Sequence, residues 1–265
     1  MKMRHILMSC ILGFGLMDIH ASHAQDMPVE NDPVLDEMEA QASGGDFIIP
    51  DARTIDAEYA AAASMLDAKG VPERPGHLMV IVDRGPQQLL MVVYPQTDGG
   101  WRLIASSHIS TGKPGRREHF KTPTGVFTLD GSILDYRAQG TFNENHIRGI
   151  GLKGSRVWDF GWQTTTDWRT NTDTMQIRME MHATDPVLTR YFGHPASEGC
   201  IRIPAEMNRL IDRYGVLDEH PNESAMSGSA SWKQVLGKDH HYINQAGDTM
   251  VIVDVPAPQT QTALK

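Results

Sequence analysis

Short apolar runs alternate with turn residues between positions 77 and 131, a pattern typical of β-strands. The runs cover residues 78–84, 87–95 and 101–110, and the turns between them cover residues 85–86 and 97–100. Because strands joined by such short turns usually pair with each other, the pattern predicts an antiparallel meander. A loop that begins at Ser110 then leads to a further expected strand at residues 125–129.

Later segments add both strands and helices. The alternation of residues 174–183 and of residues 249–255 predicts two more strands. Helical spacing predicts one helix over residues 51–70 and another from Pro204 to Gly215. The apolar face expected for the first helix comprises Ile55, Tyr59, Ala62, Ala63 and Leu66.

Residues 132–178 form a connection that is unusually long and rich in aromatic and basic side chains. Long irregular segments of compact domains are commonly lids or binding loops. Trp158 and Trp162 are therefore candidates for contact with a substrate, although packing in the core would suit the same side chains. A plain insertion packed on the surface is the alternative for the whole segment.

The first residues have the pattern of a secretory signal peptide, with a short basic start, an apolar stretch over residues 6–17 and small residues before position 25. We interpret residues 1–24 as this signal and expect a periplasmic protein without stable membrane insertion once the signal is removed. A membrane anchor fits less well because the stretch is shorter than the roughly 20 residues that cross a bilayer. Lipid attachment at Cys10 also fits less well, since the apolar stretch continues beyond it.

The rest of the chain divides by composition. Seven acidic residues and no basic one occur between Asp26 and Asp46, which indicates a solvated, flexible leader. With the helix that follows it, this leader occupies residues 25–75, before a main domain over residues 76–255 and a tail over residues 256–265. A formal net charge of −9 disfavours nucleic acid as a partner.

The cysteines raise the question of chemistry. Only Cys10 and Cys200 occur, so removal of the signal leaves Cys200 without a partner for a disulfide. Such a thiol is either buried and inert or retained for its reactivity. A reactive thiol needs a base, and His182 at the end of an expected strand is the candidate. The backbone N–H groups of Gly199 and Cys200 could form an oxyanion hole in a tight turn.

Two other kinds of site are disfavoured by spacing. The Gly-Lys pair after Ser110 lacks the remaining residues of a phosphate-binding loop and joins strands instead of opening a helix. His119, His146 and His194 invite a zinc site with Cys200, but no paired spacing of ligands is present to build one. No metal and no organic cofactor is therefore expected.

Three stretches, residues 109–127, 181–186 and 192–204, together resemble the L,D-transpeptidase (YkuD-type) catalytic domain of bacterial cell-wall enzymes. The hallmark of that family is a histidine followed after a fixed gap by Ser/Thr-His-Gly-Cys and a basic or amide residue. The positions that fall on this pattern are His182, Ser197, Gly199, Cys200 and Arg202, with 14 residues between His182 and Ser197. The resemblance implies a mostly antiparallel β-sandwich with short helices and a long lid-like insertion.

The resemblance also implies a reaction. Cys200 attacks a carbonyl of a peptidoglycan stem peptide, His182 takes the thiol proton, and an acceptor amine resolves the thioester to give a cross-link. The donor position is either the diamino acid at position three or L-Ala at position one. A carbapenem would form an adduct with Cys200. Two alternatives stay open: a carboxypeptidase that trims stems at the same site, and a non-catalytic module that binds the wall.

One position departs from the family pattern, and two others have alternative roles. Glu198 replaces the usual histidine before Gly199, and a carboxylate so close to a thiol raises its pKa. Because of this departure, the usual donor and acceptor positions of the stem peptides are not assumed for this chain. Arg202 is expected to pair with a substrate carboxylate or in an internal salt bridge. Ser197 is expected either to bond near His182 and the substrate or to cap the turn.

Overall fold

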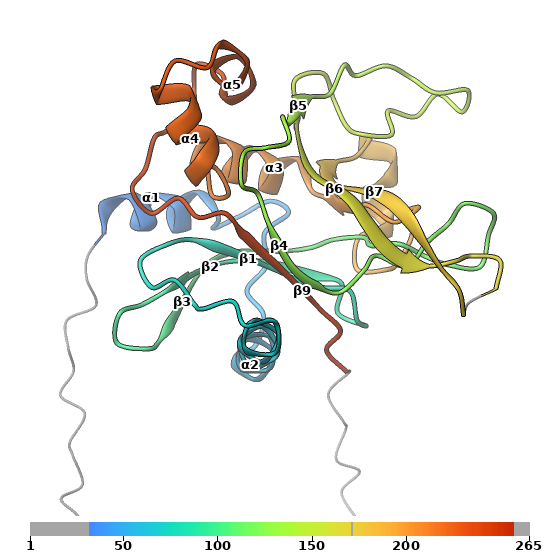
Figure 1. Cartoon of the computed structure of the whole chain (residues 1–265), viewed down its shortest axis with the longest axis horizontal. Coiled ribbons are helices and arrows are strands. Elements are labelled where there is room, and N and C mark those ends of the chain that lie inside the picture. Colours follow the sequence, from blue (N-terminus) through green and yellow to red (C-terminus); the bar gives the residue numbers. More distant parts are fainter. Residues whose placement is uncertain (1–31, 171, 257–265) are drawn as a thin grey trace, which may run out of the picture. The chain divides into compact units, whose positions relative to one another are not determined.

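A computed structural model describes residues 32–170 and 172–256, and its main feature is a pair of β-sheets (Figure 1). Residues 1–31, which include the expected signal, and residues 257–265 of the expected tail lie outside the described part. The first sheet has five strands in the order β3-β2-β1-β9-β4. These strands are β1 (Met79–Asp83), β2 (Leu89–Pro95), β3 (Trp101–His108), β4 (Gly125–Thr128) and β9 (Thr249–Val253).

Pairing in the first sheet confirms the expected meander. β1 pairs antiparallel with β2, and β2 pairs antiparallel with β3. β9, the last strand of the chain, lies between β1 and β4, parallel to the first and antiparallel to the second. The end of the expected domain is thus inserted between two strands that precede it in the sequence.

The second sheet has four strands in the order β5-β6-β7-β8. They are β5 (Tyr136–Arg137), β6 (Arg156–Thr166), β7 (Thr174–Ala183) and β8 (Ile201–Ile203). β6 and β7 form a long antiparallel pair, while β8 runs parallel to β7. Both sheets are therefore mixed but mainly antiparallel, in agreement with the expected sandwich.

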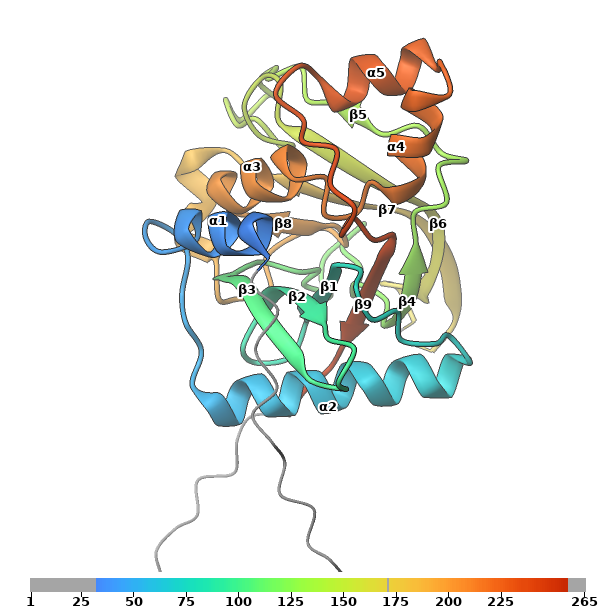
Figure 2. The same ribbon diagram turned by 90° about the vertical axis from the view of Figure 1, so that its left-hand side faces the viewer.

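Alternate residues of β1 belong to two different cores. Val80 and Val82 pack in the cluster that also contains Trp158 and Met181 of the second sheet. Met79 and Ile81 pack in another cluster, with Ala62 and Leu66 of helix α2 (Ala52–Lys69). Figure 2 shows α2 along the other side of the five-stranded sheet. The sheet is buried on both faces, which explains why all five residues of β1 are buried.

The long connection at residues 132–178 is only partly irregular, which corrects the expectation of a single lid or loop. It contains β5, the 11-residue strand β6 and the start of β7. The register of β6 against β7 shifts between Asp159 and Trp162, around Gly161 with its φ of +74°. A bulge of this kind breaks the alternation by which a strand is recognised in a sequence.

The acidic leader is also corrected in part. Residues 33–41 form helix α1 (Pro33–Gln41), in which Leu35 and Met38 are buried in the main core. Arg102 of β3 pairs with Asp36 at 2.6 Å and with Glu39 at 2.6 Å. This part of the leader is therefore packed on the domain, because its few apolar side chains share a face and its acids have a basic partner.

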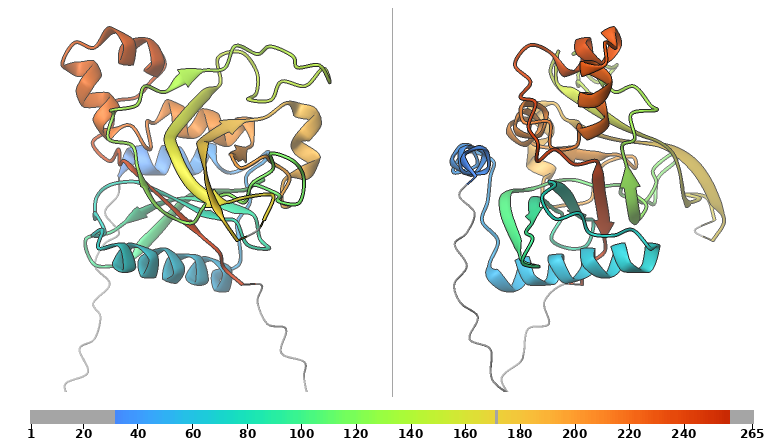
Figure 3. Two further views of the ribbon diagram at one scale, coloured as in Figure 1. Left: turned by 45° about the vertical axis from the view of Figure 1, so that its right-hand side comes forward. Right: turned by 60° about the vertical axis from the view of Figure 1, so that its left-hand side comes forward.

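Short helices accompany the second sheet (Figure 3). η1 (Pro186–Tyr191) lies between β7 and β8, and α3 (Ala205–Arg213), α4 (Glu219–Met226) and α5 (Ala230–Leu236) follow β8. α3 lies within the helix expected from Pro204 to Gly215. Buried Arg156 of β6 pairs with Asp135 at 2.8 Å and with Asp218, just before α4, at 2.9 Å. Within the described ranges, no helix is long and apolar enough to cross a bilayer.

Helix α2 carries an acid on its buried face. Thr54 and Glu58 are buried there, while the expected face residues Ile55 and Tyr59 are half-buried. Glu58 is 1% exposed and lies near Asp83, which is also buried. Burial, followed by the charge of the neighbouring Asp83, raises the pKa of Glu58 to about 8. Glu58 is therefore protonated at neutral pH.

This pair predicts that stability falls with increasing pH. The pKa of Glu58 is higher in the folded than in the unfolded chain, so the folded chain binds more protons between about pH 4.5 and 8 and loses stability across that range. Glu58→Gln keeps a side chain of similar size and removes the titration. It should flatten the dependence and raise the unfolding free energy at pH 9 by roughly 1–3 kcal/mol, one pKa unit being about 1.4 kcal/mol.

Urea unfolding at pH 5, 7 and 9 measures the effect. Asp67→Asn, at an exposed position of the same helix, is the matched control and should follow the wild type. Parallel pH profiles of the wild type and Glu58→Gln would show that the buried pair does not titrate in this range.

Candidate active site

The parallel pairing of β7 and β8 brings the expected nucleophile and base together. Met181 is level with Ile201, and His182 is level with Arg202. Met181 and Ile201 are fully buried in the core. Since side chains alternate along a strand, Glu180, His182 and Arg202 project from the opposite face, together with Cys200 just before β8. These four side chains line one cavity of about 930 Å³.

The turn before Cys200 is held by its own serine. Ser197 is fully buried, and its hydroxyl donates to the carbonyl of Cys200 at 2.5 Å and accepts from the N–H of Gly199 at 3.2 Å. Both hydrogen bonds stay inside the turn, so Ser197 shapes it, and the residue also borders the cavity. The N–H of Gly199 is thereby engaged, which corrects its expected place in an oxyanion hole.

Gly199 is required by conformation and by space. Its φ is +135°, and an added Cβ would lie 3.0 Å from Cδ1 of Ile177 and 3.4 Å from Cβ of Phe120. Its carbonyl accepts a hydrogen bond from the hydroxyl of Thr122 at 2.8 Å, and that hydroxyl accepts from the N–H of Gly112 at 2.8 Å. Thr122 is a positioning residue that sequence reasoning missed, because nothing local links it to a turn 77 residues away.

His182 is placed as a neutral base. It is 4% exposed, and its Nδ1 lies 2.6 Å from the carbonyl of Ala183. A carbonyl can only accept, so Nδ1 carries the proton and Nε2 keeps a free lone pair. Burial, followed by the charge of Arg202, lowers the pKa of His182 to about 4. The ring is therefore uncharged at neutral pH, in the tautomer that can accept a proton.

Cys200 is a thiol under the same conditions. Its side chain is half-buried, and Sγ lies 3.9 Å from the carbonyl of Arg178. Burial, with the charges of Glu180 and Glu198, raises the pKa of Cys200 to about 11, against the opposing effects of a backbone hydrogen bond at Glu180 and of the charge of Arg202. The expected effect of Glu198 has the expected sign but is smaller than that of Glu180, a residue that sequence reasoning missed. Its place two residues before His182 on a strand was the available signal.

Arg202 has no ion-pair partner within the described ranges. One guanidinium nitrogen, Nη1, donates to the carbonyl of Ala196 at 3.2 Å, while buried Nε has no hydrogen-bond partner. The internal salt bridge considered from the sequence is therefore not formed there. Its guanidinium lines the cavity and can take an anionic group.

A second, smaller cavity of about 380 Å³ meets the first at the nucleophile. Cys200 and Glu198 line both cavities, and Trp162 lines the smaller one with a side chain that is 65% exposed. Trp158 is fully buried in the main core, so its expected contact with substrate is wrong. The bulge in β6 separates these two tryptophans into a core residue and a surface residue.

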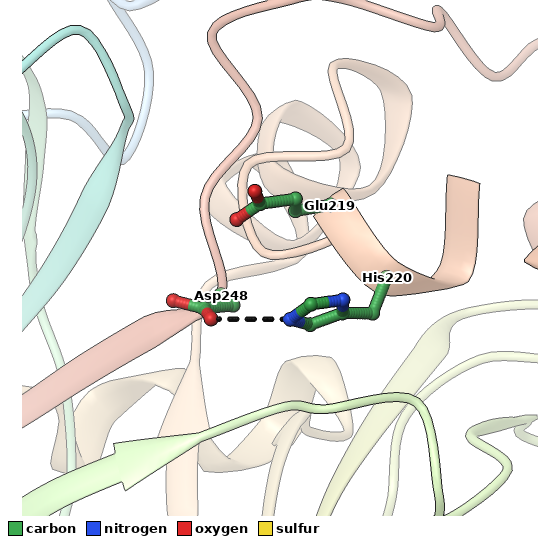
Figure 4. Close-up of side chains that lie close together, drawn as sticks. All are labelled: Glu219, His220 and Asp248. Atoms are coloured by element: carbon green, nitrogen blue, oxygen red, sulfur yellow. Dashed lines mark ion pairs between the residues drawn. The ribbon is translucent and has the colours of Figure 1, made fainter. Parts of the chain in front are cut away.

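A possible metal site lies outside this cavity, and its acidic side chains already form ion pairs. Among the described residues, one group of three potential ligands has atoms close enough to hold an ion: Glu219, His220 and Asp248 (Figure 4). Arg74 donates to both oxygens of Glu219 at 2.6 and 2.7 Å and lies 3.2 Å from Asp248. Asp248 also lies 3.4 Å from Nε2 of His220. A guanidinium thus supplies the positive charge, and this cluster is an ion-pair network.

Comparison with known proteins gives one match. Residues 78–220, more than half of the chain, match the family model of the L,D-transpeptidase catalytic domain, YkuD. The matched range contains both His182 and Cys200. No curated protein matched the chain.

The protonation states predict how Cys200 reacts with a neutral alkylating agent. Only the thiolate reacts, so with a thiol pKa near 11 the rate with iodoacetamide should rise about tenfold per pH unit between pH 7 and pH 9. Intact-mass kinetics measures this rate. Cys200→Ala gives the background, which in the full chain comprises Cys10. A plateau between pH 5 and pH 8 would instead reveal a thiolate–imidazolium pair at rest.

The two tryptophans predict opposite effects of truncation. Trp158→Ala should lower the unfolding free energy by about 3–5 kcal/mol, because it leaves a cavity in the main core. Trp162→Ala should change it by less than about 0.5 kcal/mol, as for most surface substitutions, and should raise KM for a stem peptide. Denaturant unfolding and steady-state kinetics measure the two effects. An unchanged KM would exclude Trp162 from substrate contact.

Proposed function

Because the chain belongs to the L,D-transpeptidase (YkuD) catalytic domain family, we propose that it cross-links peptidoglycan stem peptides through a thioester on Cys200. The family acts on such stem peptides. The observation that carries the proposal is the junction at Cys200, where a half-buried thiol is shared by two cavities and faces the same side as a buried, neutral histidine.

Two cavities suit a reaction with two peptide substrates. The donor carbonyl must reach Sγ first, and the acceptor amine must then reach the same carbon while the donor is still attached. A thiol at the junction of a large and a small cavity allows both approaches. Trp162 on the smaller cavity and Arg202 on the larger one offer a stacking surface and a cation for the peptides.

The protons follow from the tautomer of His182. Nε2 accepts the thiol proton as Sγ attacks the carbonyl and then returns it to the leaving amine of the donor. In the second half, Nε2 accepts a proton from the acceptor amine as the thioester breaks, and Sγ regains a proton. With the N–H of Gly199 bonded to Ser197, the N–H of Cys200 is the candidate donor to the oxyanion from this turn.

The proposal allows two donor positions, the diamino acid at position three and L-Ala at position one. Each would give a different cross-linked product. The periplasm is the proposed compartment, on the pattern of residues 1–24 alone.

Product analysis tests the proposal. The wild type, incubated with purified tetrapeptide-containing muropeptides, should give cross-linked dimers, and Cys200→Ala should give none. Mass spectrometry of the dimers identifies the residue at which the donor was cut. Shortened monomers without dimers would replace the transpeptidase by a carboxypeptidase.

Incubation with a carbapenem provides an independent measurement. The intact mass of the wild type should increase by one covalent adduct, whereas Cys200→Ala should keep its mass. A wild type that gains no adduct and forms no product would support a wall-binding module without catalysis.

A further inference from the structure

Glu180 and Arg202 lie on either side of Cys200 and His182. Their positions disfavour the transfer of a proton from the thiol to the imidazole. Met181 of β7 pairs with Ile201 of β8, and the two strands are parallel. The residues just before this pair, Glu180 and Cys200, therefore lie side by side. In the next step of the register, Arg202 lies beside His182. The negative charge is thus next to the group that must become an anion, and the positive charge is next to the group that must become a cation.

The carboxyl group of Glu180 has no cationic partner within the described ranges. Its Oε1 accepts a hydrogen bond from the hydroxyl of Tyr136 at 2.8 Å. Arg178 is the nearest basic residue on the same strand, but its guanidinium donates to Asp159 at 2.6 and 3.0 Å. Burial raises the pKa of Glu180, and the hydroxyl of Tyr136 and the charge of Arg178 offset this effect only in part.

Arg202 is the counterpart of Glu180. Its guanidinium is likewise without an ion pair there, and its Nε is buried without a hydrogen bond. Glu180 and Arg202 line the same cavity as Cys200 and His182. Two unpaired charges of opposite sign in one cavity form a receptor for a molecule that carries both complementary charges.

Other charged or titratable groups face this pair. They are Lys113, Arg116, His119, Tyr191, His194 and Glu198 on the cavity wall, with Tyr136, Asp159 and Arg178 behind Glu180. Glu198 adds a negative charge that acts on both Cys200 and Arg202, while Lys113 and Arg116 add positive charge to the cavity wall. None of them forms an ion pair with Glu180 or Arg202 in the described part of the chain.

We propose that Glu180 and Arg202 bind the ammonium and the carboxylate of a zwitterionic, amino-acid-like group on the substrate, and that this binding makes Cys200 nucleophilic. The proposal rests on the proposed function of the site and names the chemistry of its substrate. An ammonium beside Glu180 cancels the charge that opposes the thiolate, and a carboxylate beside Arg202 cancels the charge that opposes the imidazolium. The proton of Sγ then passes to Nε2 of His182, and no other reactant is needed.

The first measurement needs no turnover. Alkylation of Cys200 by iodoacetamide at pH 8 should be about three- to tenfold faster in Glu180→Gln than in the wild type, since a tenfold increase corresponds to one unit of thiol pKa. Glutamine keeps an acceptor for Tyr136 and removes only the charge. Asp67→Asn, far from the cavity on α2, removes a charge of the same sign and should leave the rate unchanged. An unchanged rate in Glu180→Gln overturns the proposal.

The second measurement tests the ligand. Calorimetry on the full chain with Cys200→Ala compares a stem peptide whose diamino acid ends in a free amine and carboxylate with the same peptide acetylated on that amine. Acetylation should weaken binding about tenfold, as for the loss of one charged hydrogen bond. With Glu180→Gln added, the two peptides should differ by less than about twofold.

The outcomes separate this proposal from the proposed function. Equal binding of the two peptides to Cys200→Ala overturns the zwitterion receptor, even where the wild type forms cross-links. A stem that binds with the expected dependence on its amine, without any cross-linked or trimmed product, supports the receptor and overturns the proposed reaction. No binding of either peptide overturns both.

Discussion

The parallel pairing of β7 with β8 is the constraint on which the site depends. It is fixed by the burial of Met181, Ile201 and Ile203, which leaves the intervening side chains on the other face. A shift of one residue would turn His182 toward the core and Met181 toward the cavity. Catalytic placement is therefore secured by ordinary hydrophobic packing, and the hydrogen bonds of Ser197 and Thr122 only complete the turn that leads to Cys200.

The electrostatics of the same face oppose a resting ion pair. Burial alone favours the uncharged forms of a thiol and an imidazole, and the order of Glu180 and Arg202 reinforces that preference. A lone thiol that stays protonated is less exposed to oxidation than a thiolate. Cys200 is thus accessible from two cavities, while its protonated thiol has a low reactivity in the absence of substrate.

Sequence reasoning identified the strands that position the site, because their apolar alternation is local and regular, as in β1, β2 and β7. The chemistry of a lone thiol indicated His182 as its base, and the resemblance to a known family supplied the spacing between His182 and Ser197. Sequence reasoning missed β6, whose alternation is broken by the bulge near Gly161, and therefore left Trp158 open between substrate contact and the core, where it lies. It also read α1 as solvated, because the ion pairs of Arg102 with Asp36 and Glu39 join segments that are distant in sequence. Thr122 was missed for the same reason.

Unpaired charges at the site contrast with the treatment of charge elsewhere in the fold. Arg156 is fully buried and is matched by Asp135 and Asp218, and Arg74 is matched by Glu219 and Asp248. Glu58, buried near Asp83, avoids a buried charge by keeping its proton at neutral pH. Glu180 and Arg202, in the cavity that holds Cys200, have hydrogen bonds but no ion pair among the described residues. Since unmatched, partly buried charges reduce stability, their presence there is best explained by a ligand that supplies the missing charges.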